Sequence, residues 1–269
     1  MNGKKILFVS SELMPYLPET QVSQMSYETP KMVNGKGGQI RIFMPRYGNI
    51  NERRHQLHEV IRLSGMNLVI NDMDMPLIIK VASIPKERIQ VYFIDNEEYF
   101  KRKATFTDVD GKLFPDNDER AIFFAKGVVE TVKKLNWSPD IIHVHGWMAS
   151  LVPLYLKQFY ADEPLFADSK VVTSVYGNGF EGELNTDIVN KIGFDGISND
   201  KIENLTAPNY NNMLKVAVDY SDAIILASEE VKEELNNYIA NLDKPVLSYV
   251  PLQEFEEAYT NFYSNEVLK

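Results

Sequence analysis

The sequence lacks cysteine, and its basic residues are outnumbered by acidic ones. Its 269 residues include no Cys, so disulfides, thiolate nucleophiles and Cys-based metal sites are excluded. Lys and Arg number 28 against 38 Asp and Glu, which gives a formal net charge of −10. Because such a surface repels phosphate, we expect no nucleic-acid partner.

Long hydrophobic runs are also missing. No apolar stretch reaches the roughly 18 to 20 residues that a membrane span needs. Residues 1–5 lead directly into a strand pattern, without the apolar segment and the small-residue cleavage site of a signal peptide. We therefore expect a cytoplasmic protein without a membrane partner.

The hydrophobic pattern predicts strands that alternate with helices. Strands are predicted at 5–9, 39–44, 77–82, 88–94, 140–145, 170–176, 223–226 and 245–250, with a weak one within 65–75. Helices are predicted at 23–33, 117–135, 148–160, 212–219 and 228–239, the last capped by Ser228. This order predicts an α/β fold with a doubly wound parallel sheet, in which 77–82 and 88–94 form a hairpin or an edge.

Between residues 178 and 212 the sequence is polar and poor in periodicity, and we predict a long surface excursion there. In a doubly wound sheet, ligands bind outside the carboxyl ends of the strands. The segments after Val9, Met44, His145 and Tyr176 are therefore the places to look for a site.

Two histidines and two glycine-rich segments have alternative interpretations. His143 and His145 lie two apart on one strand and face the same side, which suits a metal or a base, but no third ligand is evident and we predict no metal. Residues 177–182 and 35–38 are predicted to form a turn and a helix end, because neither has the spacing of a phosphate-binding loop.

A series of short motifs along residues 4–239 resembles one known family. The motifs are Ser10-Ser11-Glu12 with Pro15-Tyr16, Pro45-Arg46-Tyr47-Gly48, Tyr99-Phe100-Lys101-Arg102 before Asp116-Asn117 and Arg120, residues 139–145 with Trp147, and Ser221-Asp222-Ala223. In this order they resemble the N-terminal domain of the glycogen and starch synthases. These are retaining glucosyltransferases that use a nucleotide-glucose donor and have two Rossmann-like domains, the GT-B type.

The resemblance implies a set of substrate-binding positions. They are Glu12, Tyr16, Asp116, Asn117, His145 and Trp147. Two alternatives stay open, because Asp116 or Asn117 would also cap the following helix and His145 would also serve as a packing residue. The resemblance identifies no catalytic residue and implies no cofactor.

The loop after the first strand departs from the family pattern. Where the family has a lysine, two glycines, a leucine and an aspartate, this sequence has Pro18, Thr20, Gln21, Val22 and Gln24. Pro18 offers neither an N–H group nor a charge to a phosphate. The family's His-Asp-Trp is here His145-Gly146-Trp147. We therefore expect a degenerate donor loop.

These observations leave the enzymatic status uncertain. We expect residues 1–269 to form a single synthase-like N-terminal domain, without the second Rossmann-like domain, that is inactive alone and binds an α-glucan or a true synthase. The alternative is one half of a split synthase that transfers glucose from ADP- or UDP-glucose when a second chain completes the cleft. A third class is a purely structural or regulatory interaction protein. A large apolar patch on the face where the second domain would dock would favour a protein partner. A polar face there would favour a domain that functions without one.

Overall fold

The computed structural model describes residues 1–85 and 87–269. Within these residues the strands form one sheet in the order β10-β9-β8-β7-β1-β2-β6-β5-β3, with β4 paired to β5. The strands are β1 (Lys5–Ser10), β2 (Gln39–Pro45), β3 (His58–Glu59), β4 (Met66–Ile70), β5 (Met73–Ile84), β6 (Ile89–Asp95), β7 (Ile141–His145), β8 (Lys170–Val175), β9 (Ala223–Leu226) and β10 (Val246–Leu247).

The central strands run parallel, as the sequence predicts. Strand β1 pairs with β2 and with β7 in parallel register, and Ile6 lies opposite Ile40 on one side and Ile141 on the other. All five residues of β7 are buried. A strand that is covered on both faces needs apolar residues on both, which is why these strands are continuous hydrophobic runs rather than alternating ones.

One end of the sheet is antiparallel. Strand β5 pairs antiparallel with β6, and β3 and β4 both pair antiparallel with β5. The predicted hairpin of residues 77–82 and 88–94 is therefore confirmed, and the weak strand expected within 65–75 includes β4. The sheet is mixed, with a dominant parallel part that carries the doubly wound crossovers.

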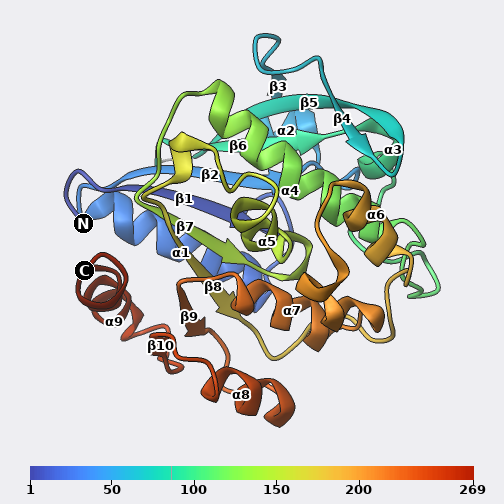
Figure 1. Ribbon diagram of the computed structural model, residues 1–269. Coiled ribbons are helices and arrows are strands. Elements are labelled where there is room, and N and C mark those ends of the chain that lie inside the picture. Colours follow the sequence, from blue (N-terminus) through green and yellow to red (C-terminus); the bar gives the residue numbers. More distant parts are fainter. Residues whose placement is uncertain (86) are drawn as a thin grey trace.

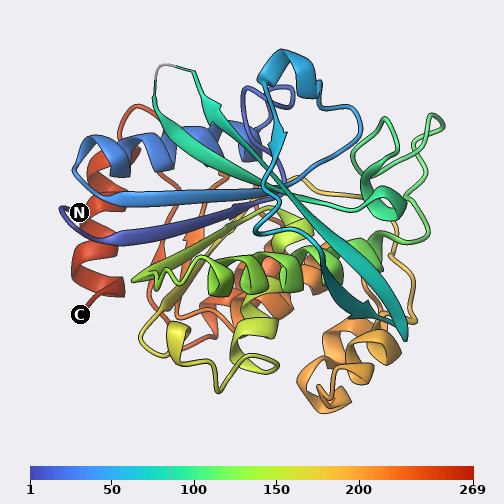
Figure 2. The same cartoon turned by 90° about the horizontal axis from the view of Figure 1, so that it is seen from above.

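Helices cover both faces of the sheet (Figures 1 and 2). Helix α1 lies on one face, and α4 lies on the opposite face, where it packs beside α5. The α-helices are α1 (Gln21–Gly35), α2 (Glu52–His55), α3 (Glu97–Phe100), α4 (Asn117–Lys134), α5 (Val152–Lys157), α6 (Ile188–Phe194), α7 (Tyr210–Asp219), α8 (Glu233–Ala240) and α9 (Phe255–Phe262). Short helical turns are η1 (Trp147–Ala149), η2 (Pro164–Phe166), η3 (Asn199–Lys201), η4 (Glu203–Thr206) and the π-helical η5 (Tyr263–Val267).

Several predicted boundaries are wrong. The helix expected at 148–160 is divided into η1 and α5, because Pro153 has no N–H to continue a preceding helix and instead takes a position in the first turn of α5. Ser228 does not cap α8, which begins at Glu233 after Lys232. The last strand is only Val246–Leu247.

The stretch 178–212 is also not a simple surface excursion. It contains α6, η3 and η4, and it buries Ile188, Ile192 and Leu205 completely or nearly so. Ile188 and Ile192 are four residues apart and thus share one face of a single short helix. This apolar face is too short to stand out in a polar sequence.

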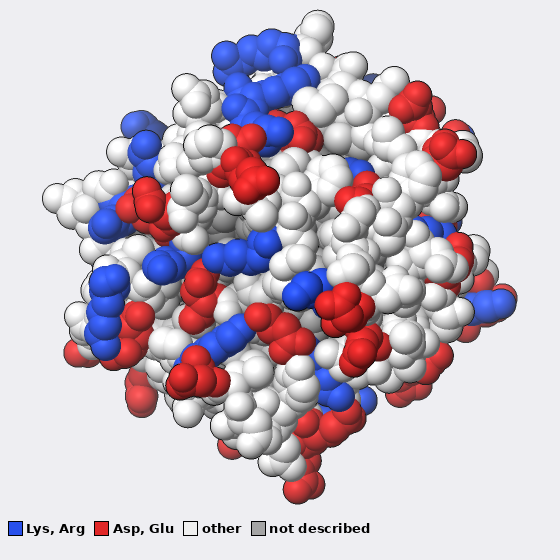
Figure 3. Space-filling view, viewed as in Figure 1, with Lys and Arg blue, Asp and Glu red and all other residues white. Residues whose placement is uncertain are grey.

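Acidic and basic side chains are interspersed over the face drawn in Figure 3, apart from a small basic group above β3 at the top of the view. In residues 1–85 and 87–269, no helix has both the length and the apolar character needed to cross a membrane.

Candidate functional site

A cavity of about 480 Å³ opens at the carboxyl ends of β1, β7 and β8. Its volume is in the range of sites for small molecules, about 300 to 1,000 Å³. The residues that line it are Glu12, Thr20, Gln21, Val22, Phe106, Thr107, Gly146, Trp147, Tyr176, Asn178, Gly179, Phe180 and Tyr210. The segments after Val9, His145 and Tyr176 thus contribute to it, whereas the segment after Met44 does not.

The first wall of the cavity is the loop after β1 and the start of α1. Thr20 is the N-cap of α1, and its hydroxyl accepts a hydrogen bond from Ser23 N at 3.0 Å while Thr20 N donates to Ser23 Oγ at 2.8 Å. The Thr20 hydroxyl also donates to Glu12 Oε2 at 2.9 Å. A carboxylate therefore already lies beside the positive end of α1, where an incoming anion would otherwise be stabilised.

The second wall is a chain of aromatic rings. Phe106 and Trp147 have ring centroids 4.8 Å apart, Trp147 and Phe180 are 4.9 Å apart, and Phe180 and Tyr210 are 5.9 Å apart. Gly179 permits this packing, because a Cβ there would lie 2.0 Å from the Tyr210 ring. The loop predicted to be a turn is thus also a packing element of the aromatic wall.

Buried histidines lie behind the cavity. Nδ1 of His145 lies 2.8 Å from the hydroxyl of Tyr176, and no hydrogen-bond partner is present for Nε2 of His145 among the described residues. Burial lowers the pKa of His145 to about 3, so its imidazole is neutral at physiological pH. Burial also raises the pKa of Tyr176 well above its usual value, and this phenol therefore stays protonated.

Gly146 joins this floor to the aromatic wall in a conformation that only glycine adopts readily. Its φ and ψ are 78° and 161°. A Cβ at this position would lie 2.6 Å from Ser11 Oγ, which accepts a hydrogen bond from Met148 N. The glycine that replaces the family's aspartate is thus required by this backbone path.

The charge of the cavity is one-sided. Glu12 contributes the only ionisable carboxylate of the lining, and no Lys, Arg or His among residues 1–85 and 87–269 lines the cavity. Burial raises the pKa of Glu12, and the hydrogen bond from Thr20 opposes that shift. Within the same residues no cluster of three or more His, Asp or Glu side chains is arranged to hold a metal ion.

Only some of the predicted substrate-binding residues lie at the cavity. Glu12 and Trp147 line the cavity, and His145 is buried directly before Gly146. Tyr16 does not line it, because its ring packs between His55 and Phe93 with centroid distances of 4.9 Å to each.

Asp116 and Asn117 lie at the start of α4, outside the lining. Asp116 accepts a hydrogen bond from Arg102 at 2.6 Å and makes no side-chain cap, although it occupies the N-cap position. Asn117 accepts from Arg120 at 2.6 Å and donates to Phe106 O at 2.8 Å. Their side chains support the loop that carries Phe106.

The residues of the degenerate donor loop are divided in the same way. Thr20, Gln21 and Val22 line the cavity, whereas Pro18 and Gln24 do not. The Pro18 carbonyl accepts a hydrogen bond from Ser23 Oγ at 2.9 Å and so helps to fix the start of α1.

The strand-end rule indicates the segment of Phe180, directly after Tyr176, but not Phe106, Thr107 or Tyr210. Phe106, Thr107 and Tyr210 do not directly follow a predicted strand. The compositional signal that could have indicated them is aromaticity, since Phe106 and Tyr210 are aromatic and lie in a loop and at a helix start.

A family model for the starch synthase catalytic domain matches residues 5–244. The chain belongs to this family. A glycogen synthase from Chlorobium limicola is 37% identical to this synthase-family chain over 232 residues, which cover 86% of the chain and 47% of the relative. A glycogen synthase from Chlorobaculum tepidum is 33% identical over 255 residues, 91% of the chain and 49% of the relative.

The fold of the family is confirmed by a solved structure. The catalytic domain of starch synthase IV from Arabidopsis thaliana, bound to ADP and acarbose, superposes with a TM-score of 0.72 at 14% identity. The alignment covers 93% of this synthase-family chain and 52% of the other. The chain thus spans about half the length of the curated relatives and the solved structure that it matches.

Proposed function

We propose that this chain is a single synthase-type domain that binds an α-1,4-glucan in the cavity and does not transfer glucose by itself. It acts in the cytoplasm, in glycogen metabolism, as a glucan-binding or partner-binding module. The observation that carries the proposal is the cavity lining, which combines a run of aromatic rings with one carboxylate and, in the described part of the chain, no basic side chain.

Aromatic walls suit a sugar ring. One face of a glucosyl unit is mostly C–H and packs on an aromatic ring, while its hydroxyls need carboxylate, amide or hydroxyl partners at the edges. Trp147 and Phe180 provide the rings, and Glu12, Gln21 and Asn178 provide polar groups around them. Such a mixture of apolar walls and a few directed polar groups is the usual composition of a small-molecule site.

A nucleotide-sugar donor suits the same cavity poorly. A diphosphate needs cations or free N–H groups at a helix start, and each charge-assisted contact contributes about 1.5 to 3 kcal/mol. The capping box of Thr20 and Ser23 already uses Ser23 N, and Glu12 adds a negative charge beside the same helix end. The Glu12 carboxylate would therefore repel a donor diphosphate at the place where the resemblance implies a lysine and glycines that attract it.

The exposed apolar residues favour independence from a docked second half. In residues 1–85 and 87–269 the large apolar side chains with the highest exposure are Ile61, Val69, Met73, Val109, Phe159, Phe194, Val246 and Tyr249. None of them lines the cavity, and only Val109 comes from the loop that carries Phe106 and Thr107.

Calorimetric titration tests the proposal. The purified chain is expected to bind maltoheptaose and to show no heat with ADP-glucose, and it is expected to incorporate no labelled glucose into glycogen. Acarbose and ADP, the two compounds bound to the structurally similar starch synthase IV domain, form a second pair of probes. Binding of ADP-glucose without maltoheptaose binding, or transfer by the chain alone, would refute the proposal.

The alternative is one half of a split synthase, in which a second chain supplies the other side of the cleft. It predicts that a second chain carrying the other half restores glucose transfer. A mixture of the two chains would then label glycogen from ADP- or UDP-glucose, whereas neither chain would do so separately. If neither maltoheptaose nor a donor binds and a protein partner is recovered instead, the regulatory class replaces both.

A further inference from the structure

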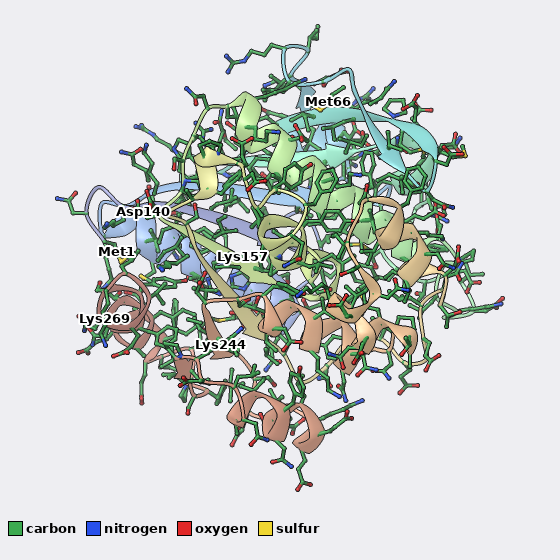
Figure 4. All side chains as sticks on the ribbon, viewed as in Figure 1. Met1, Met66, Asp140, Lys157, Lys244 and Lys269 are labelled. Atoms are coloured by element: carbon green, nitrogen blue, oxygen red, sulfur yellow. The ribbon has the colours of Figure 1, made fainter. Side chains whose placement is uncertain are left out.

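The C-terminal segment from residue 245 onward lies beyond the residues that the family model matches. It nevertheless packs against the body of the domain. Val246 of β10 lies opposite Ile224 in the sheet, Thr260 of α9 contacts Met32 of α1, and the Ser264 hydroxyl approaches Met1 Sδ at 3.7 Å. Figure 4 accordingly shows Met1 and Lys269 on the same side of the molecule.

This segment reaches the buried histidines behind the cavity. Tyr263, at the start of η5, is completely buried, and its hydroxyl lies 2.6 Å from Nδ1 of His143. Tyr259 of α9 packs nearby, with its ring centroid 6.5 Å from that of His143. Residues 120 positions apart in the sequence are therefore joined by one buried hydrogen bond.

A continuous path leads from Tyr263 to the cavity. Nε2 of His143 lies 2.8 Å from Ser174 Oγ, and the rings of His143 and His145 have centroids only 4.0 Å apart. His145 in turn contacts the hydroxyl of Tyr176, which lines the cavity. Every member of this path is at most 1% exposed.

The path has a defined proton arrangement. A neutral imidazole has one donor and one acceptor nitrogen, so the partner of one nitrogen fixes the state of the other. If the Tyr263 hydroxyl donates to Nδ1 of His143, then Nε2 carries the proton and donates to Ser174. Without that hydroxyl, Nδ1 would be a buried atom without a partner, which favours the other tautomer or a shift of the ring.

We propose that the C-terminal segment holds the cavity floor in its ligand-binding form and that Tyr263 is a positioning residue for Tyr176, acting through His143 and His145. This inference rests on the proposed glucan site, and it adds a part of the chain that the family match does not include.

The first test compares two buried tyrosines. Tyr263→Phe removes only the hydroxyl that contacts His143, and it is expected to weaken maltoheptaose binding at least fivefold. Tyr155→Phe is the matched control, because it removes a buried phenol that donates to Asp195 at 2.7 Å away from the cavity lining. Its binding is expected to stay within twofold of the unsubstituted chain. Equal affinities of both variants would overturn the proposal.

Two further measurements keep the test decisive. Should Tyr263→Phe fail to fold, Ser174→Ala breaks the path on the other side of His143 and is expected to weaken binding similarly; unchanged binding counts against the proposal. Nitrogen-15 spectra of the four histidines need no ligand. Tyr263→Phe is expected to shift the ring signals of both His143 and His145, and Tyr155→Phe neither.

The spectra also separate this inference from the proposed function. If the unsubstituted chain does not bind maltoheptaose, the glucan proposal fails, but a shift at His145 in Tyr263→Phe still supports the coupling of the segment to the floor. An unchanged His145 signal refutes the coupling whether or not the glucan binds.

Discussion

Carboxylates between α4 and α6 are paired with lysines, whereas the carboxylate in the cavity is not. Between the helices, Lys191 contacts Asp118 at 2.6 Å and Glu119 at 2.8 Å, and Lys126 contacts Asp195 at 2.5 Å, all with little exposure of the lysines. In the cavity, the Glu12 carboxylate accepts a hydrogen bond from the Thr20 hydroxyl and has no ion-pair partner among residues 1–85 and 87–269. The buried lysines Lys126 and Lys191 thus neutralise structural carboxylates instead of facing the site.

The comparison indicates why the affinity of a cavity for an anionic ligand is lost more easily by substitution than the ion pairs that stabilise the fold. A buried ion pair is strongly destabilised when one partner is removed, so its residues are constrained by folding. A cation that only awaits a ligand has no such constraint, because it stabilises nothing in the unliganded protein.

The largest effect is expected where the ion pairs are broken. Asp195→Ala removes the partner of Lys126 and of the Tyr155 hydroxyl, and leaves a buried cation without a counter-charge. The free energy of unfolding is expected to fall by about 3 to 5 kcal/mol. Urea denaturation measures it.

Glu266→Ala is the control for this experiment, since the pair of Lys269 and Glu266 is largely exposed. A loss within about 0.5 kcal/mol is expected there. A similar loss in both variants would contradict the contrast between buried and exposed pairs.

The second effect concerns pH and the two buried histidines. Burial lowers the pKa of His145 to about 3 and that of His143 well below its usual 6.5, so the unfolded chain binds more protons than the folded one between these values. The two neutral histidines therefore make their full contribution to the free energy of unfolding above pH 6.5, and this contribution is lost as the pH falls. From pH 6 to pH 5 the free energy of unfolding is expected to fall by about 2 kcal/mol.

His145→Gln removes one of the two contributions, and the loss of stability over the same pH interval should be about half as large. His58→Gln is the control, because His58 is exposed. The explanation fails if both substitutions leave the pH dependence unchanged, as followed by urea denaturation at each pH.

The third effect sharpens the role of the aromatic wall. Trp147→Leu is expected to weaken maltoheptaose binding about tenfold, or about 1.4 kcal/mol, because the ring that would pack on a glucosyl unit is gone. The other tryptophan of the chain, Trp137, lies over Arg41 outside the cavity and gives the control Trp137→Leu. Equal titration curves for the two variants would exclude the wall as the glucan site.

The smallest effect is expected when a cation is returned to the cavity. Gln21→Lys places a positive charge in the lining, and the affinity for ADP-glucose is expected to rise about two- to fivefold, because the residue is exposed and its charge is screened. Gln24→Lys adds the same charge outside the lining. If the affinity for ADP-glucose rises equally in both variants, the cause is the added net charge and not the position of the lysine in the cavity.

Much of the fold was predictable from the sequence, because buried parallel strands are short apolar runs that are visible locally. The strands near residues 5–9, 39–44 and 140–145 are found where they were expected. Helix starts were less predictable, since α8 begins at Glu233 and not after Ser228, whose hydroxyl accepts a hydrogen bond from Glu230 N at 3.3 Å.

The site was predictable only in part. The rule that ligands bind at the carboxyl ends of strands indicates the loops of Glu12 and Trp147, which do line the cavity. Tyr210 starts a helix more than 30 residues after β8, and the bond between Tyr263 and His143 spans 120 positions. Such contacts depend on packing between distant segments and have no local pattern.

The conformation of Gly146 has a consequence for any attempt to rebuild a synthase from this chain. Installing the aspartate of the family at that position would force its Cβ against Ser11, and the peptide would have to rotate away from the path that now leads into Trp147. Restoring the donor loop alone would leave this obstacle in place. A revertant therefore needs coordinated changes at two neighbouring turns.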